Sequence, residues 1–118
     1  GHRIGSGEIE AIVMENKSII ECSAISVRDY LEGNKIYLFV VTKEKNINDK
    51  VEKKIVSNFG TYAIPKKIFY VNELPKTRSG KIMRRILREI ILNKKTNSDR
   101  STILNSKVLN QIDKIVNK

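Results

Sequence analysis

Apolar side chains recur along the chain at two spacings, one typical of amphipathic helices and one typical of buried strands. In residues 6–14 the apolar side chains share one helical face, and Ser6 stands where a capping residue is favoured. The apolar run at residues 36–41 is rich in β-branched and aromatic side chains, which is typical of a buried strand. Along the whole chain, the pattern predicts helices at residues 6–14, 48–59, 81–92 and 106–117, and strands at residues 20–27, 36–41 and 67–71.

Turn-forming residues separate these predicted elements. Residues 29–34 have the composition of a turn, Gly60 is placed to end the second helix, and Pro65 precedes the last strand. The polar stretch at residues 93–102 is typical of a linker. We therefore predict a small mixed α+β domain, with a roughly three-stranded sheet flanked by helices, an N-terminal β-hairpin-like segment and a C-terminal helix.

The bulk composition limits the class of protein. The chain has 118 residues, the size of one domain, and 40% of them are hydrophobic, which is enough for a modest core. No apolar run approaches the ~20 residues that a bilayer-spanning helix needs, and no signal peptide is recognisable. The single cysteine, Cys22, excludes an internal disulfide and lies in an apolar run that indicates a buried structural thiol. One histidine and one cysteine are too few for a zinc site of the usual kind.

Positive charge is the strongest signal in the composition, with a formal net charge of +10. A basic domain can bind nucleic acid, an anionic membrane or a small polyanion such as a nucleotide. The charge concentrates in residues 76–95, where eight residues are basic and one is acidic. A solvated helix face is the simplest explanation of such a pattern. This segment contains no aromatic residue, which argues against the stacking of single-stranded nucleic acid.

The loop before the helix predicted at residues 81–92 holds the candidate chemistry. Gly80 allows the backbone to approach a ligand closely, and Lys81 adds a positive charge at the first turn of that helix. Because free N–H groups at a helix start favour anions, these residues alone predict a site for phosphate or another oxyanion. The P-loop pattern G-x-x-x-x-G-K-[ST] is absent.

The sequence P-K-T-R-S-G-K at residues 75–81 resembles P-x-T-x-[SG]-G-K, the last core motif of the acyl-adenylate-forming superfamily. Its continuation to Arg88, K-T-R-S-G-K-I-M-R-R-I-L-R, resembles the form found in AMP-forming acetyl-CoA synthetases and their short-chain relatives. Residues 1–10 are similar to the motif G-H-R-[IL]-x-x-x-E-I-E that follows the interdomain hinge of this family. Residues 60–65 are similar to the G-x-x-A-x-P that precedes its last strand, so the resemblance covers nearly the whole chain.

The resemblance implies that residues 1–95 are the mobile C-terminal (lid) domain of an acid–thiol ligase and that residues 96–118 are a linker and terminal helix. The large N-terminal domain that binds ATP and the acyl group is then absent from this sequence. The implied reaction converts acetate, ATP and CoA to acetyl-CoA, AMP and pyrophosphate through acetyl-AMP, with Lys81 as the catalytic residue of adenylation. The implied cofactors are ATP or AMP, CoA and Mg²⁺, bound mostly by the N-terminal domain, and the isolated chain is expected to be inactive.

The resemblance also implies binding residues. Gly1 matches the glycine that lets the pantetheine of CoA pass, and Arg3 matches an arginine that contacts the nucleotide phosphate. Arg78 and Gly80 are implied contacts of the loop before Lys81.

Two implied sites depart from the usual pattern. Val56 stands where relatives place an arginine at the CoA 3′-phosphate, so Lys53 and Lys54, one turn away, are the candidates to replace it. Some relatives bind a cation through oxygen atoms just after the first helix, where this chain has asparagine in place of the usual histidine. The matching positions are Met14, Asn16 and Ile19.

The implied partners are the N-terminal domain of the same protein, the substrates acetate, ATP and CoA, and a lysine acetyltransferase and deacetylase that act on Lys81. Neither nucleic acid nor a membrane is among them. The expected location is cytoplasmic, and in a eukaryote also nuclear. Two alternatives remain open: a propionyl- or acetoacetyl-CoA synthetase, because the acyl pocket lies in the N-terminal domain, and a stand-alone basic module that binds nucleic acid.

Overall fold

The computed structural model describes residues 5–31, 33–93 and 107–117. These residues form two compact units, the first ending at Tyr70 and the second beginning at Val71. In the described ranges there are four α-helices and three strands, which confirms the prediction of a small α+β fold. The boundary predicted between residues 95 and 96 lies outside the described ranges, so that division stays a prediction.

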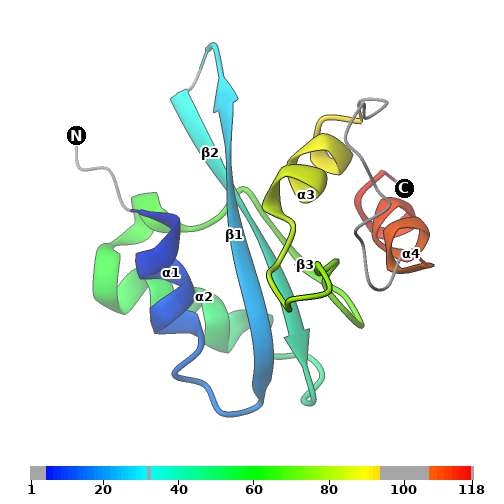
Figure 1. Cartoon of the computed structure of the whole chain (residues 1–118). Coiled ribbons are helices and arrows are strands. Elements are labelled where there is room, and N and C mark those ends of the chain that lie inside the picture. The colour runs from blue at the N-terminus through cyan, green and yellow to red at the C-terminus, as the bar shows by residue number, and fades with distance from the viewer. Residues whose placement is uncertain (1–4, 32, 94–106, 118) are drawn as a thin grey trace. The chain divides into compact units, whose positions relative to one another are not determined.

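The first unit is built around a sheet with the strand order β1-β2-β3 (Figure 1). β1 and β2 are antiparallel and form a hairpin, whereas β3 pairs with β2 in parallel. The parallel pairing is possible because a helix carries the chain from the end of β2 back to the start of β3. The elements of this unit are α1 (Ser6–Val13), β1 (Ile19–Asp29), β2 (Gly33–Thr42), α2 (Asn48–Phe59), a 3₁₀ turn (Thr61–Ala63) and β3 (Lys67–Tyr70).

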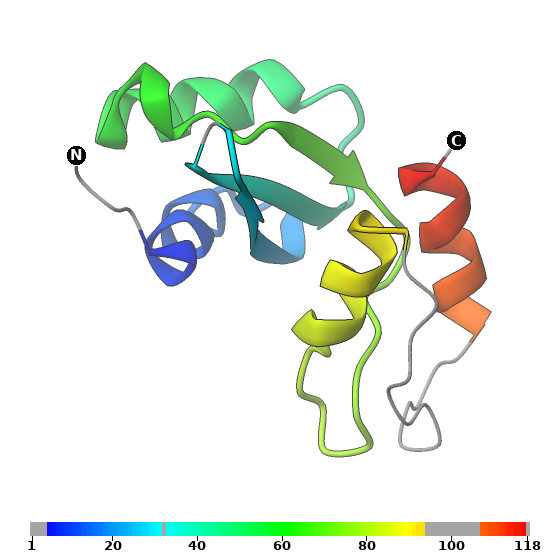
Figure 2. The same cartoon turned by 90° about the horizontal axis from the view of Figure 1, so that it is seen from above.

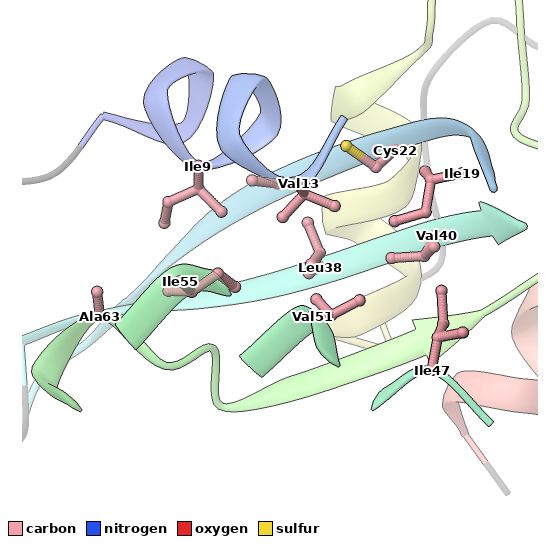
Figure 3. Close-up of a cluster of buried hydrophobic side chains, with 11 residues drawn as sticks. Ile9, Val13, Ile19, Cys22, Leu38, Val40, Ile47, Val51, Ile55 and Ala63 are labelled. Atoms are coloured by element: carbon pink, nitrogen blue, oxygen red, sulfur yellow. The ribbon is translucent and has the colours of Figure 1, made fainter. Parts of the chain in front are cut away.

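The helices α1 and α2 pack on one face of this sheet and enclose a hydrophobic core. Figure 3 shows apolar side chains from both helices around Leu38 of β2, which is fully buried. Burial of one large aliphatic side chain contributes roughly 1.5–3 kcal/mol to folding. The core cluster consists of Ile9, Val13, Ile19, Cys22, Ala24, Leu38, Val40, Ile47, Val51, Ile55 and Ala63.

The strand β2 is apolar on both faces, as its uninterrupted hydrophobic run predicts. Leu38 and Val40 belong to the core cluster on the helix-covered face, and Phe39 alternates with them on the opposite face. There the ring of Phe39 packs against Phe69 of β3, with 5.3 Å between the ring centroids. The aromatic contact stabilises the parallel pairing of β2 and β3.

Two acidic side chains hold α1 in place. Glu8 Oε2 accepts the N–H of Gly5 at 3.2 Å, and Glu10 Oε2 accepts the N–H of Ala24 on β1 at 2.8 Å. The first bond closes the helix start, and the second ties the helix to the edge strand. Gly5, in an extended conformation, is the N-cap, so the prediction that Ser6 caps the helix is wrong by one residue.

Gly60 ends α2, as the sequence predicts. Its N–H donates to the C=O of Val56 at 2.8 Å, and its φ of +94° is a conformation that side-chain-bearing residues avoid. A Cβ at this position would lie 3.1 Å from the ring of Tyr62. The backbone conformation therefore requires glycine here, and a side chain would in addition displace the exposed ring of Tyr62 slightly.

The second unit contains α3 (Arg84–Ile91) and α4 (Lys107–Val116), which contact each other. The side-chain amide of Asn117 donates to the C=O of Ile90 at 2.9 Å, which joins the chain just beyond α4 to the end of α3. Because α3 begins at Arg84, the helix predicted at residues 81–92 is three residues shorter at its start than expected. The predicted linker at residues 93–102 lies outside the described residues except for its first position. None of the helices in the described part of the chain has the length and apolar composition that a membrane crossing requires.

Candidate functional site

Residues 75–83 form a narrow β-hairpin that leads into α3, visible in Figure 2 as a yellow-green excursion of the chain. Lys76 and Ile82 make an antiparallel bridge at its centre. Toward the tip, the N–H of Thr77 donates to the C=O of Lys81 at 2.9 Å. The sequence predicted only a loop here, because backbone hydrogen bonds of this kind do not produce a regular spacing of apolar residues that could be recognised.

Gly80 closes the tip of the hairpin. Its N–H donates to the C=O of Thr77 at 2.9 Å, which completes a four-residue β-turn, and its φ is +90°. A left-handed residue after such a turn is a common way to close a three-residue hairpin loop. No atom lies within 4 Å of the position that a Cβ would take. Gly80 is thus required for its backbone conformation, and its contact with a ligand stays a prediction.

Two hydroxyl groups stabilise the same turn. The N–H of Lys81 donates to Thr77 Oγ1 at 3.2 Å, and that oxygen lies 2.9 Å from Ser79 Oγ. Both polar backbone groups of Lys81 are therefore bonded to Thr77. Sequence reasoning assigned no role to Thr77, although a hydroxyl residue that opens a glycine-containing turn is a recognisable signal.

The Lys81 side chain is exposed on this hairpin. In the described ranges no carboxylate forms an ion pair with its ammonium group. Arg78, at the tip, is exposed as well. The hairpin therefore presents positive charge that is available to an anion from another part of a larger protein or from a ligand.

Lys81 does not lie in the first turn of a helix, which corrects the prediction. Met83 is the N-cap and α3 begins at Arg84, so Lys81 still belongs to the hairpin. Pairing with Thr77 satisfies both backbone polar groups of Lys81 and so outweighs helical continuation. The candidate anion site therefore depends on side-chain charge and not on the free N–H groups of a helix start.

The helix α3 separates charge from apolar surface. Arg84, Arg85 and Arg88 are exposed, whereas Ile86 and Leu87 are buried. This arrangement accounts for much of the charge cluster as one solvated helix face.

Lys53 and Lys54, the predicted contacts of the CoA phosphate, differ in environment. Lys54 Nζ lies 2.8 Å from Glu15 Oε1, whereas Lys53 is exposed. Lys54, Glu15 and Lys50 help to line an open pocket of about 240 Å³ beside α2. A phosphate at Lys54 would compete with Glu15, so Lys53 is the better placed of the two candidates.

Of the candidate cation positions, Met14 and Asn16 lie between α1 and β1, and Ile19 is the first residue of β1. Asn16 Oδ1 accepts the N–H of Ser18 at 2.9 Å, and its backbone C=O accepts the N–H of Ile19 at 3.0 Å. Each of these oxygens keeps a second lone pair. Within the described residues there is no group of three or more His, Cys, Asp or Glu side chains suited to a metal ion. The cation site stays a prediction.

Tyr70, at the end of β3, is bonded to α2. Its hydroxyl donates to Asn48 Oδ1 at 2.7 Å, and Asn48 Nδ2 donates to Glu52 Oε1 at 3.0 Å. Burial, with a smaller effect of the Glu52 charge, raises the pKa of Tyr70 to about 12. The protonated phenol thus ties the strand to the helix across the neutral pH range.

The remaining predicted contacts, Gly1 and Arg3, lie outside the described residues. Their roles stay predictions, as does the acetylation of Lys81.

The segment from the first turn of α1 through the sheet to the tip of the hairpin matches one family model. Residues 8–81 match the AMP-binding enzyme C-terminal domain. The chain belongs to this family. The match ends at Lys81 itself, so it includes the whole of the hairpin turn.

Curated relatives of this AMP-binding enzyme C-terminal domain include acetyl-coenzyme A synthetases. That of Emericella nidulans is 41% identical over 118 residues, which cover 95% of this chain and 18% of the relative. That of Campylobacter jejuni is 38% identical over 128 residues, which cover 98% of this chain and 19% of the relative. The mitochondrial acyl-CoA synthetase short-chain family member B of Dictyostelium discoideum is 41% identical over 119 residues, which cover 96% of this chain and 17% of the relative. The chain spans less than one fifth of the length of these relatives.

Solved structures share the fold. The acyl-CoA synthetase of Brucella canis matches with a TM-score of 0.66 and 28% identity, over 75% of this chain and 17% of that one. The fatty acyl CoA synthetase of Mycobacterium tuberculosis matches with a TM-score of 0.67 and 23% identity, over 75% of this chain and 18% of that one. The second likeness concerns the fold alone.

Proposed function

We propose that this domain is the C-terminal part of an acetyl-CoA synthetase, in which Lys81 serves the adenylation of acetate. The observation that carries the proposal is the exposed Lys81 ammonium on a hydrogen-bonded hairpin inside the matched segment. Acetyl-coenzyme A synthetases that are 41% and 38% identical over 95% of this chain support the choice of substrate class. Because the chain spans only 18% of those relatives, the substrates would be bound mainly by the rest of the full-length protein.

In the first half-reaction, a carboxylate oxygen of acetate attacks the α-phosphorus of ATP, and the bond to the bridging oxygen breaks as pyrophosphate leaves. The barrier arises because two anions approach each other and charge develops on the α-phosphate. A positioned ammonium group offsets both effects. Lys81 would supply that charge, with Arg78 and Gly80 at the tip of the same hairpin. Mg²⁺, bound through the rest of the protein, would supply further charge neutralisation at the phosphates.

In the second half-reaction, the CoA thiol loses its proton and its sulfur attacks the acyl carbon of acetyl-AMP, so that AMP leaves. Gly1 would let the pantetheine arm pass, and Arg3 would contact the nucleotide phosphate. Lys53 would contact the CoA 3′-phosphate. Lys54 would also bind this phosphate only if its ion pair with Glu15 broke.

The exposure of Lys81 also suits regulation by acetylation, which removes the positive charge. A lysine acetyltransferase and a deacetylase in the cytoplasm, or in the nucleus of a eukaryote, would be the partners. Site-specific incorporation of acetyl-lysine at position 81 of the full-length protein is expected to stop adenylation and to spare thioester formation. The same modification at exposed Lys45 serves as the control and is expected to change neither half-reaction.

Exchange of pyrophosphate into ATP tests the proposal most directly in the full-length protein. Lys81→Ala is expected to abolish acetate-dependent exchange and to spare acetyl-CoA formation from supplied acetyl-AMP. Lys45→Ala, which removes a charge from an exposed turn of the first unit, is expected to leave both activities unchanged. Normal exchange in Lys81→Ala would refute the proposed role.

Two alternatives have their own tests. Comparison of acetate, propionate and acetoacetate as substrates of the full-length protein identifies the acyl chain. A titration of DNA and RNA binding against salt tests the nucleic-acid module, which requires sub-micromolar affinity with a steep salt dependence. No observation on the described residues favours that module over the ligase.

A further inference from the structure

Thr77 holds Lys81 at both of its polar backbone groups. The N–H of Thr77 donates to the Lys81 C=O at 2.9 Å, and the N–H of Lys81 donates to Thr77 Oγ1 at 3.2 Å. The Thr77 C=O also accepts the N–H of Gly80 at 2.9 Å. One residue therefore organises both the turn and the backbone of the lysine that follows it.

We propose that the Thr77 hydroxyl is a positioning residue for Lys81 in the adenylation half-reaction, an inference that rests on the proposed function. A hydroxyl has one donor hydrogen and two acceptor lone pairs. Whichever of Thr77 and Ser79 donates across their 2.9 Å contact, Thr77 Oγ1 keeps a lone pair for the Lys81 N–H. The bond to Lys81 does not depend on the orientation of Ser79.

The bond matters because the lysine side chain is long and exposed. Its ammonium group is separated from the backbone by four methylene groups, and no carboxylate in the described ranges restrains it. The backbone anchor therefore sets the region that the ammonium group can reach. A misplacement of about 1 Å at a reacting centre can cost as much as a hundredfold in rate.

Two substitutions separate the hydroxyl of Thr77 from its methyl group. In the full-length protein, Thr77→Val keeps the branched shape and loses the acceptor, whereas Thr77→Ser keeps the hydroxyl and loses the methyl. We expect Thr77→Val to lower kcat for acetate-dependent pyrophosphate exchange about fivefold, the effect of one neutral hydrogen bond, with KM for ATP unchanged within about twofold. Thr77→Ser is expected to retain kcat within about twofold.

Three further measurements isolate the effect. Acetyl-CoA formation from supplied acetyl-AMP is expected to be unchanged in Thr77→Val, because that step does not use Lys81. Amide hydrogen exchange at Lys81 is expected to accelerate in Thr77→Val and not in Thr77→Ser. The control Thr61→Val makes the same chemical change at an exposed threonine of the first unit and is expected to leave exchange activity unaltered.

The outcomes distinguish this inference from the proposed function. Loss of activity in Lys81→Ala together with a wild-type kcat in Thr77→Val would overturn the role of Thr77 and leave the role of Lys81 intact. Equal losses in Thr77→Val and Thr77→Ser would also overturn it, because they would indicate packing and not the hydroxyl. Normal exchange in Lys81→Ala would overturn both.

Discussion

The left-handed conformation of Gly80 predicts a measurable effect of adding one methyl group. The substitution Gly80→Ala places a Cβ at a residue with a φ of +90°. An L-residue pays roughly 1–2 kcal/mol for the left-handed region, whereas alanine returns about 0.4–1 kcal/mol by restricting the unfolded chain. Because no atom lies within 4 Å of the Cβ position, no steric conflict adds to this sum. We expect hairpin closure to lose about 1 kcal/mol, which is about a fivefold fall in the closed-to-open ratio.

Amide hydrogen exchange followed by NMR on residues 1–118 measures this opening directly. The N–H of Thr77 is bonded across the hairpin at 2.9 Å, so its protection factor reports how often the hairpin opens. Gly80→Ala is expected to lower that protection about fivefold, and Gly80→Asn less, because asparagine tolerates positive φ. Gly7→Ala, in the first turn of α1 with no atom within 4 Å of its Cβ position, is the control. It is expected to stabilise α1 by at most about 0.5 kcal/mol, the lower end of the value for a helix interior, and to leave the protection of Thr77 unaffected.

Two results would refute the reasoning about Gly80. Unchanged protection of Thr77 in Gly80→Ala would mean that the backbone conformation is not what requires glycine. A loss far above tenfold would require a steric conflict at the tip, which the open space around the Cβ position excludes.

Three other substitutions in residues 1–118 test the first unit by urea unfolding. The pKa of Tyr70 is raised to about 12 from an ordinary value of about 10, so its contribution to stability is complete below pH 10 and is lost as the pH rises toward 12. The stability of Tyr70→Phe should therefore fall less steeply with pH between about pH 10 and pH 12, the range of the shift, than that of the unmodified chain. An equally steep fall would contradict this reasoning. Leu38→Ala, at a fully buried site, should lower the free energy of unfolding by about 2–5 kcal/mol, and a loss under about 1 kcal/mol would show that the core is not packed as described. Gly60→Ala should lower the free energy of unfolding more than Gly80→Ala does, because the added Cβ would also lie 3.1 Å from a ring carbon of Tyr62. Equal losses would indicate that this contact does not destabilise the fold.

Local sequence patterns predicted most of the secondary structure because helices and strands are encoded by the spacing of apolar residues. The continuous apolar run at residues 36–41 predicted a buried strand, and the structure confirms a strand there, in which residues 38–41 are buried. The helix that Gly60 ends lies where its apolar period placed it. The motif at residues 75–81 pointed to the family, because a match between residue types at fixed positions can be recognised without knowing which residues are in contact.

Only the tertiary structure decided the form of the candidate site. The residues around Lys81 were predicted to start a helix, yet backbone pairing with Thr77 places them in a hairpin and moves the helix start to Arg84. Which groups form such bonds depends on the geometry of the turn and on which backbone groups come close together. Neither produces a regular spacing of residue types in the sequence. The same reason hid the bond between Glu10 and the edge strand. The sequence by itself thus determined which residue carries the charge, and the fold determined how that residue is held.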